Sequence, residues 1–83
     1  MYELIIKEYI NKLNINDIKK YAYNNNISLN DNETNYLYNF IKNRWRELYR
    51  KKDITILYKL KDNINIDAYN HIITLFNKYK NKY

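Results

Sequence analysis

The sequence predicts an all-α fold, with four to five short helices in a small irregular bundle and the third helix central. Apolar residues make up 46% of the 83 residues, and they recur at helical spacing. The chain contains no glycine and no proline, so asparagine and aspartate must cap and break the helices. A chain of this length forms one domain, and we assign a single helical domain to residues 1–83.

The first two helices follow from an apolar stripe and a capping signal. A helix is expected over residues 2–12, because one stripe contains Tyr2, Ile6, Tyr9, Ile10 and Leu13. Asn14, with Asp17 three residues later, predicts a capping box and a second helix that ends near Tyr23. The Asn24-Asn25-Asn26 run is expected to end this helix in place of glycine.

The third helix is predicted to be the longest, from about Asp31 to Arg50. Residues 27–29 form a short extended link before it, and Asn30 with Glu33 predicts its capping box. Its apolar stripe consists of Leu37, Phe40, Ile41, Trp45 and Leu48.

Two further helices are expected after a break at Lys51-Lys52-Asp53. Asp53 is the predicted N-cap of a short fourth helix, which carries Ile54, Leu57, Tyr58 and Leu60. Asn65 is the predicted N-cap of the fifth helix, whose apolar side consists of Tyr69, Ile72, Ile73, Phe76 and Tyr79.

The composition argues against enzymatic chemistry. Without glycine there is no P-loop or dinucleotide-binding motif, and without cysteine there is no thiol nucleophile or cysteine-built zinc site. The single histidine, His71, is expected on the surface with no special role. Five of the nine acidic residues lie near predicted helix starts, where the helix dipole favours them. We therefore expect no catalytic residue, cofactor, metal or small-molecule substrate.

The charge favours anionic partners but not a membrane. The formal net charge is +6, which suits nucleic acid or another anionic surface. The longest aliphatic run, Leu4-Ile5-Ile6, is far too short to span a bilayer, and no signal peptide is recognisable, so a cytoplasmic location is expected. Asn, Ile, Lys and Tyr, all drawn from A/T-rich codons, supply 52 of the 83 residues, so coding bias accounts for part of the lysine excess.

The sharpest positive signal lies on the third helix. Lys42, Arg46 and Arg50 are spaced four residues apart and form a basic stripe. The candidate phosphate-contacting residues are Lys42, Arg44, Arg46, Arg50, Lys51 and Lys52, which include all three arginines of the chain. The alternative interpretation is a solvated helix face opposite the apolar stripe.

The tyrosines support a second interpretation. Tyr9, Tyr69 and Tyr79 lie on apolar stripes and are expected in the core, whereas Tyr36, Tyr38 and Tyr49 lie off the stripe of the third helix. Such residues cover neighbouring helices, form protein interfaces or stack on bases. Trp45, at the edge of its stripe, is expected to be half-buried.

A family resemblance rests on the order of these segments. The chain has a capped short helix ending in Lys20-Tyr21-Ala22, an Asn26-Ile27-Ser28 link and a long apolar-striped helix. The Lys51-Lys52-Asp53 break and a C-terminal helix with Ile72, Leu75 and Phe76 complete the series. This order resembles the DUF2624 type, a small uncharacterised family of low-GC Firmicutes, which implies no activity, cofactor or site residue. Residues 13–41 have a weaker similarity to DNA-binding helix-extended-loop-helix modules of the SAP type.

Two functions are therefore carried forward. The first is a small non-enzymatic module that binds an unknown protein partner or a second copy of itself. The second is a nucleic-acid-associated protein that contacts phosphates through the basic stripe. The first is preferred, because the basic excess is partly explained by codon usage.

Overall fold

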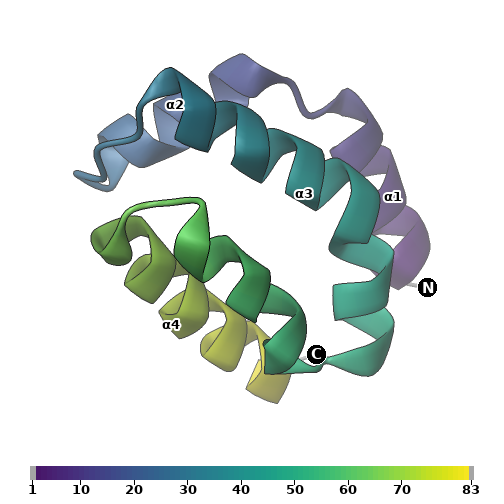
Figure 1. The fold of residues 1–83 in the computed structure, drawn as a ribbon. Coiled ribbons are helices and arrows are strands. Elements are labelled where there is room, and N and C mark those ends of the chain that lie inside the picture. Colours follow the sequence, from purple (N-terminus) through teal and green to yellow (C-terminus); the bar gives the residue numbers. More distant parts are fainter. Residues whose placement is uncertain (1, 83) are drawn as a thin grey trace.

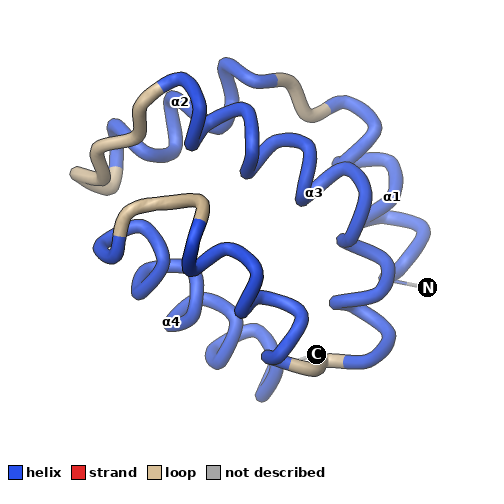
Figure 2. Tube along the Cα trace, viewed as in Figure 1, coloured by secondary structure: helices blue, strands red, loops and turns tan. Residues whose placement is uncertain are grey.

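The computed structural model describes residues 2–82 and contains five helices in that range, with no strand. They are α1 (Tyr2–Lys12), α2 (Ile15–Asn24), α3 (Asp31–Lys51), η1 (Ile54–Asp62) and α4 (Ile66–Lys82), joined by short connections (Figures 1 and 2). The predicted all-α bundle is confirmed, and α3 is the longest helix with 21 residues. Within residues 2–82, no helix is long and apolar enough to cross a membrane.

Two reciprocal capping boxes begin α2 and α3, as predicted. The Asn14 side chain accepts from the Asp17 backbone N–H at 3.1 Å, and the Asp17 carboxylate accepts from the Asn14 N–H at 3.0 Å. Asn30 and Glu33 repeat the arrangement at 2.8 and 2.9 Å. Each box satisfies backbone donors that the first turn of a helix leaves unpaired.

The last two helices also begin at their predicted caps. Asp53 accepts from the Thr55 backbone N–H at 3.0 Å, and Asn65 accepts from the Ala68 N–H at 2.9 Å. The fourth helix, η1, is a 3₁₀-helix over nine residues, longer than this tighter helix usually runs.

Left-handed residues end α2 and α3. Asn26 has φ 59°, and the hydrogen bonds from Ile27 N to Ala22 O and from Asn26 N to Tyr23 O complete a Schellman motif. Lys52 has φ 49° at the end of α3, a conformation that glycine or asparagine adopts more readily than lysine. The expected break is therefore present at Lys51-Lys52-Asp53, with a lysine in the left-handed position.

The helices form two layers that meet at the turn around Lys52. The helices α1 and α2 both pack on α3, while η1 packs on α4 and also contacts α3 (Figure 1). The core lies where α3, η1 and α4 meet, and its buried members are Leu37, Phe40, Ile56, Leu57, Leu60, Ile64 and Ala68. The predicted central position of α3 follows from these contacts.

Several aromatic residues expected in the interior lie on the surface instead. Tyr9 is 68% exposed and Tyr79 is 39% exposed, while Tyr69 is half-buried against the core. Tyr2 on α1 and Tyr58 on η1 are also exposed. The physical reason on α1 is that it packs against α3 alone, so one side of its apolar stripe has no neighbouring helix. Trp45 is half-buried, as predicted.

Candidate functional site

The predicted basic stripe of α3 lies beside α1, where Lys42 is half-buried, while the side chains of Arg46 and Arg50 stay 47% and 62% exposed. The Lys42 ammonium donates to the carbonyl oxygen of Ile10 at 2.6 Å and to that of Asn11 at 3.4 Å. Both carbonyls belong to the last turn of α1, where backbone acceptors have no partner within the helix and a cation is favoured by the dipole. Lys42 therefore acts as a tertiary C-cap that fixes α1 onto α3.

Glu3, at the other end of α1, binds the two arginines of the stripe. The Arg50 guanidinium donates to both Glu3 carboxylate oxygens, at 2.7 and 2.8 Å, and Arg46 Nε lies 3.9 Å from Oε2. The hydrogen bond from Arg50 lowers the pKa of Glu3 below its usual value, and the same contact raises the pKa of Arg50. Arg46 also lies over the ring of Trp45, 4.8 Å from its centroid.

The three remaining candidate cations are Arg44, in the middle of α3, and Lys51 and Lys52 at its C-terminal end. Arg44 and Lys51 both pair with Glu47, and the hydrogen bond from Arg44 lowers the pKa of that carboxyl. Lys52 is the half-buried, left-handed cap residue. Five of the six candidate phosphate contacts therefore have partners within the chain. Phosphate binding here stays a prediction, and a phosphate would have to compete with Glu3 and Glu47.

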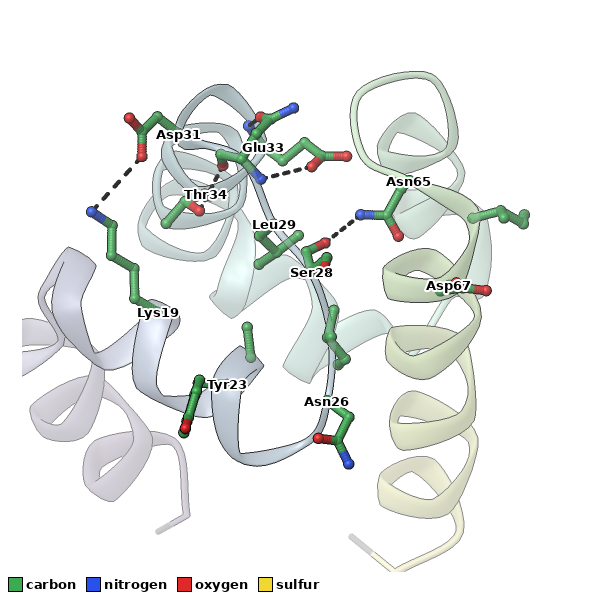
Figure 3. A pocket seen from close by; sticks show the side chains of 14 residues that line it. Lys19, Tyr23, Asn26, Ser28, Leu29, Asp31, Glu33, Thr34, Asn65 and Asp67 are labelled. Atoms are coloured by element: carbon green, nitrogen blue, oxygen red, sulfur yellow. Dashed lines mark hydrogen bonds and ion pairs between the residues drawn. The ribbon is translucent and has the colours of Figure 1, made fainter.

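A depression of about 850 Å³ with a mixed polar and apolar lining lies at the opposite end of α3, beside the start of α4. The Lys19 ammonium lies 3.9 Å from the Asp31 carboxylate, and the Asn65 side chain donates to the Ser28 carbonyl at 2.6 Å. Figure 3 shows both pairs at the edge of the depression. The Glu33 carboxylate is committed to its capping box. Within residues 2–82, acidic and histidine side chains form no group of three or more that could hold a metal. The polar groups here hold helix starts and loops together.

An apolar groove of about 350 Å³ lies between the two layers of helices. Its deepest members are core residues, among them Leu37, Phe40, Leu57 and Leu60. Its edges are residues at the end of α1, along α2 and along α4. The side chains that line these edges are Tyr9, Leu13, Asp17, Tyr21, His71 and Leu75. The groove is therefore an opening into the hydrophobic core.

Apolar side chains continue from the groove onto the surface. Tyr9 and Tyr21 on one edge are exposed, and so is Leu75, by 41%, on the other. His71 was expected as a surface residue with no special role, but it is half-buried and lies against Tyr21. The Tyr21 hydroxyl is 2.9 Å from His71 Nε2, and the two rings meet edge-on. This contact joins α2 to α4 across the groove.

The groove is suited to binding rather than to acid–base chemistry. Among its lining residues, Asp17 and His71 are the polar side chains other than tyrosine. Asp17 is held by the Asn14 backbone and His71 by the Tyr21 hydroxyl. The surrounding surface is almost entirely aliphatic and aromatic, which is typical of a site that takes apolar groups.

Sequence reasoning did not identify this groove. The sequence of α4 did contain a signal for the groove. Leu75 makes the apolar face of this helix wider than the apolar stripe that packs on η1. A helix whose apolar face exceeds what one neighbour covers indicates a second contact or an exposed patch. The opening itself is lined by residues from all five helices, which no single helix reveals.

Comparisons with known proteins give this chain no relatives. No family model, no curated protein and no solved structure matches it. The resemblance to the DUF2624 type therefore stays a prediction, and the functional argument rests on the geometry of the chain itself.

Proposed function

We propose that this chain is a non-enzymatic, cytoplasmic protein-interaction module that receives apolar side chains of a partner in the groove between α2 and α4. One observation carries the proposal: an apolar groove of about 350 Å³ opens from the core and continues into exposed Tyr9 and Leu75. Protein interiors are normally close-packed, so an unfilled apolar opening in so small a core is costly. Apolar groups from a partner would fill it.

The size of the groove sets what it can accept. An apolar cavity of about 150 Å³ holds one benzene molecule. The groove therefore has room for roughly two side chains of leucine or phenylalanine size. An amphipathic helix presents such anchors at i and i+3 or i+4, and a groove between helices is a recurrent receptor for them.

The nucleic-acid alternative has weaker support from the same contacts. Lys42, Arg46 and Arg50 hold α1 on α3, so phosphate binding would compete with the packing of the fold.

Selection from a peptide library tests the proposal. The library displays helices of about four turns with random residues on one face, and the protein is the immobilised bait. We expect enrichment of Leu, Ile, Phe or Trp at i, i+3/i+4 and i+7. Tyr9→Glu and Leu75→Glu, at opposite edges of the groove, should each abolish capture of the selected helices.

Tyr58→Glu is the matched control, since Tyr58 is 53% exposed on η1 and does not line the groove. Circular dichroism establishes that each variant retains its helices. The proposal is wrong if no apolar pattern is enriched, or if Tyr58→Glu weakens binding as much as the two groove variants.

A further inference from the structure

The helix α1 has apolar side chains on two sides. On its inner side Ile10 is buried, and on its outer side Tyr2, Ile5 and Tyr9 are 56%, 64% and 68% exposed. A helix that is apolar on two sides is normally covered by more than one neighbour, whereas within residues 2–82 α1 packs on α3 alone. The outer face of α1, formed by its three exposed apolar residues, therefore has no covering element in this part of the chain.

The outer face of α1 has the spacing of a ligand for the apolar groove. Tyr2, Ile5 and Tyr9 stand at positions i, i+3 and i+7. At about 100° per residue they lie within roughly 60° of one another, on one side of the helix. An amphipathic helix uses this pattern to fill a groove between helices. One chain therefore contains both an apolar groove and a helix of the kind that such a groove receives.

The helix face and the groove are adjacent on one surface of the molecule. Tyr9 belongs to the outer face of α1 and also lines the edge of the groove, and Leu13, one turn later, lines it too. When a helix lies beside the groove that can receive it, a two-fold axis between two copies brings each helix to the groove of the other copy. Such an interface closes as a dimer, because it uses the helix and the groove of both copies.

We propose that the partner in the groove is a second copy of this chain, and that α1 of each copy lies across the groove of the other. This inference rests on the proposed function and names the partner. The groove has room for roughly two side chains of leucine or phenylalanine size. Ile5 and Tyr9, one helical turn apart on the outer face of α1, are two anchors of this size.

The exposed apolar area is sufficient for a dimer. A leucine or isoleucine side chain has about 130 Å² of apolar surface, at roughly 30 Å² per carbon, and a tyrosine contributes about 150–250 Å². With their exposed fractions, the outer face of α1 together with Tyr21 and Leu75 at the groove edges offers about 400–550 Å². A homodimer interface of standard size buries about 800 Å² per partner, of which about 65% is apolar, or roughly 500 Å².

The charges at the proposed contact permit two copies to meet. The side chains of α1 carry no net charge, because Glu3 and Glu8 balance Lys7 and Lys12. Among the residues that line the groove there is no lysine or arginine. The formal net charge of +6 therefore lies mainly outside the contact, and its repulsion is screened by salt.

Sedimentation velocity over about 1 µM to 1 mM protein tests the proposal. We expect the mass to rise with concentration from that of one chain, 10.4 kDa, to twice that value and to stop there. Ile5→Lys changes the helix side of the contact, since Ile5 does not line the groove, and Leu75→Glu changes the groove side. Each should raise the dissociation constant of the dimer by about tenfold or more, because it places a charge in an apolar contact.

Ile66→Glu is the matched control for both variants. Ile66 is 58% exposed at the start of α4 and does not line the groove. Its replacement should leave the dissociation constant unchanged. Circular dichroism establishes that all three variants retain their helices.

A mixture of the Ile5→Lys and Leu75→Glu proteins shows which surface meets which. In a mixed dimer, the unmodified helix of one copy meets the unmodified groove of the other, and at the second contact the introduced lysine meets the introduced glutamate. We expect the mixture to dimerise at concentrations where each variant alone is monomeric. If the mixture associates no better than the separate variants, the pairing of helix with groove is wrong.

The remaining outcomes separate this inference from the function on which it rests. A protein that stays monomeric to about 1 mM overturns the second copy as partner. So does a mass that continues to rise beyond two chains, or a dimer that Ile66→Glu dissociates as strongly as Ile5→Lys. The peptide selection, repeated with the Ile5→Lys protein as bait, tests the groove by itself. Capture of apolar helices by this bait retains the proposed function without a dimer, whereas no capture and no dimer overturn both.

Discussion

The hydroxyl of Tyr21 on α2 lies 2.9 Å from Nε2 of His71 on α4, and the two rings meet at 65° with their centroids 5.7 Å apart. These residues are 50 positions apart in the sequence. They join the two layers of helices at the edge of the apolar groove, far along the chain from the turn at Lys52. The separation of α2 from α4 is therefore controlled in part by one side-chain pair.

A double-mutant cycle measures this contact. Tyr21→Phe retains the ring and removes the hydroxyl, while His71→Ala removes the imidazole. We expect a coupling free energy of about 0.5–1.5 kcal/mol from urea unfolding, as for an ordinary side-chain hydrogen bond. Additive effects of the two substitutions would show that the pair does not hold the layers together.

The local parts of this fold could be predicted from the sequence, because their determinants lie within a few residues. The capping boxes of Asn14 and Asn30 each join residues three positions apart, so the pattern alone locates the helix starts. The left-handed conformation of Lys52 could not be predicted from the sequence, since lysine rarely adopts that conformation. There only the break itself was predictable.

The tertiary parts could not be read from helical periodicity. The stripe of Lys42, Arg46 and Arg50 was predicted correctly as one face of α3, but a helical wheel cannot tell whether a polar face meets water or another helix. Its partner Glu3 is 47 residues from Arg50. In the same way, Tyr9 lies on an apolar stripe yet is exposed, because no helix covers that side of α1.

Loss of the Lys42 ammonium should release α1 from α3. Lys42→Met retains much of the aliphatic chain and removes the donor to the Ile10 and Asn11 carbonyls. We expect the free energy of unfolding to fall by about 1.5–3 kcal/mol, the range for hydrogen bonds from charged groups. Hydrogen exchange should accelerate most in α1.

Lys61→Met is the matched control for this substitution. Lys61 is exposed on η1 and makes no side-chain hydrogen bond or ion pair with residues 2–82. Its replacement should change stability by less than about 0.5 kcal/mol. Equal effects of the two lysine substitutions would rule out a capping role for Lys42.

Stability should decrease in acid because three carboxyls have lowered pKa values. A hydrogen bond from Arg50 lowers the pKa of Glu3, and a hydrogen bond from Arg44 lowers the pKa of Glu47. Hydrogen bonds from Thr55 lower the pKa of Asp53. The folded state therefore binds protons less readily than the unfolded state. Its stabilisation is complete above the ordinary carboxyl pKa of about 4, and it is lost as pH falls through the lowered values.

Glu3→Gln isolates one of these contributions. The variant should melt at a lower temperature than the unmodified protein at pH 7, and the two melting curves should converge at low pH, where Glu3 is protonated in both states. Glu8→Gln, on the same helix but without an ion pair, should leave the pH dependence unchanged. A constant difference between Glu3→Gln and the unmodified protein at all pH values would contradict this account.

Replacing Lys52 by glycine should stabilise the protein. Lys52 has φ 49° and ψ 38°, and its N–H donates to the Leu48 carbonyl at 2.9 Å to close the last turn of α3. A left-handed residue with a Cβ costs about 1–2 kcal/mol, and glycine avoids this cost but loses more entropy on folding. We expect Lys52→Gly to raise the free energy of unfolding by about 0.5–1 kcal/mol.

Lys52→Gln removes the same charge and keeps the Cβ, so it should give no such gain. Asn26→Gly, at φ 59° in the other left-handed position, should gain less than Lys52→Gly because asparagine already tolerates that region. If urea unfolding shows glutamine and glycine at position 52 to be equally stabilising, then charge repulsion among Arg50, Lys51 and Lys52, and not backbone strain, governs this turn. If the glycine variant instead has a higher free energy of unfolding than the proteins with lysine or glutamine, the left-handed backbone at position 52 is the source of the lost stability.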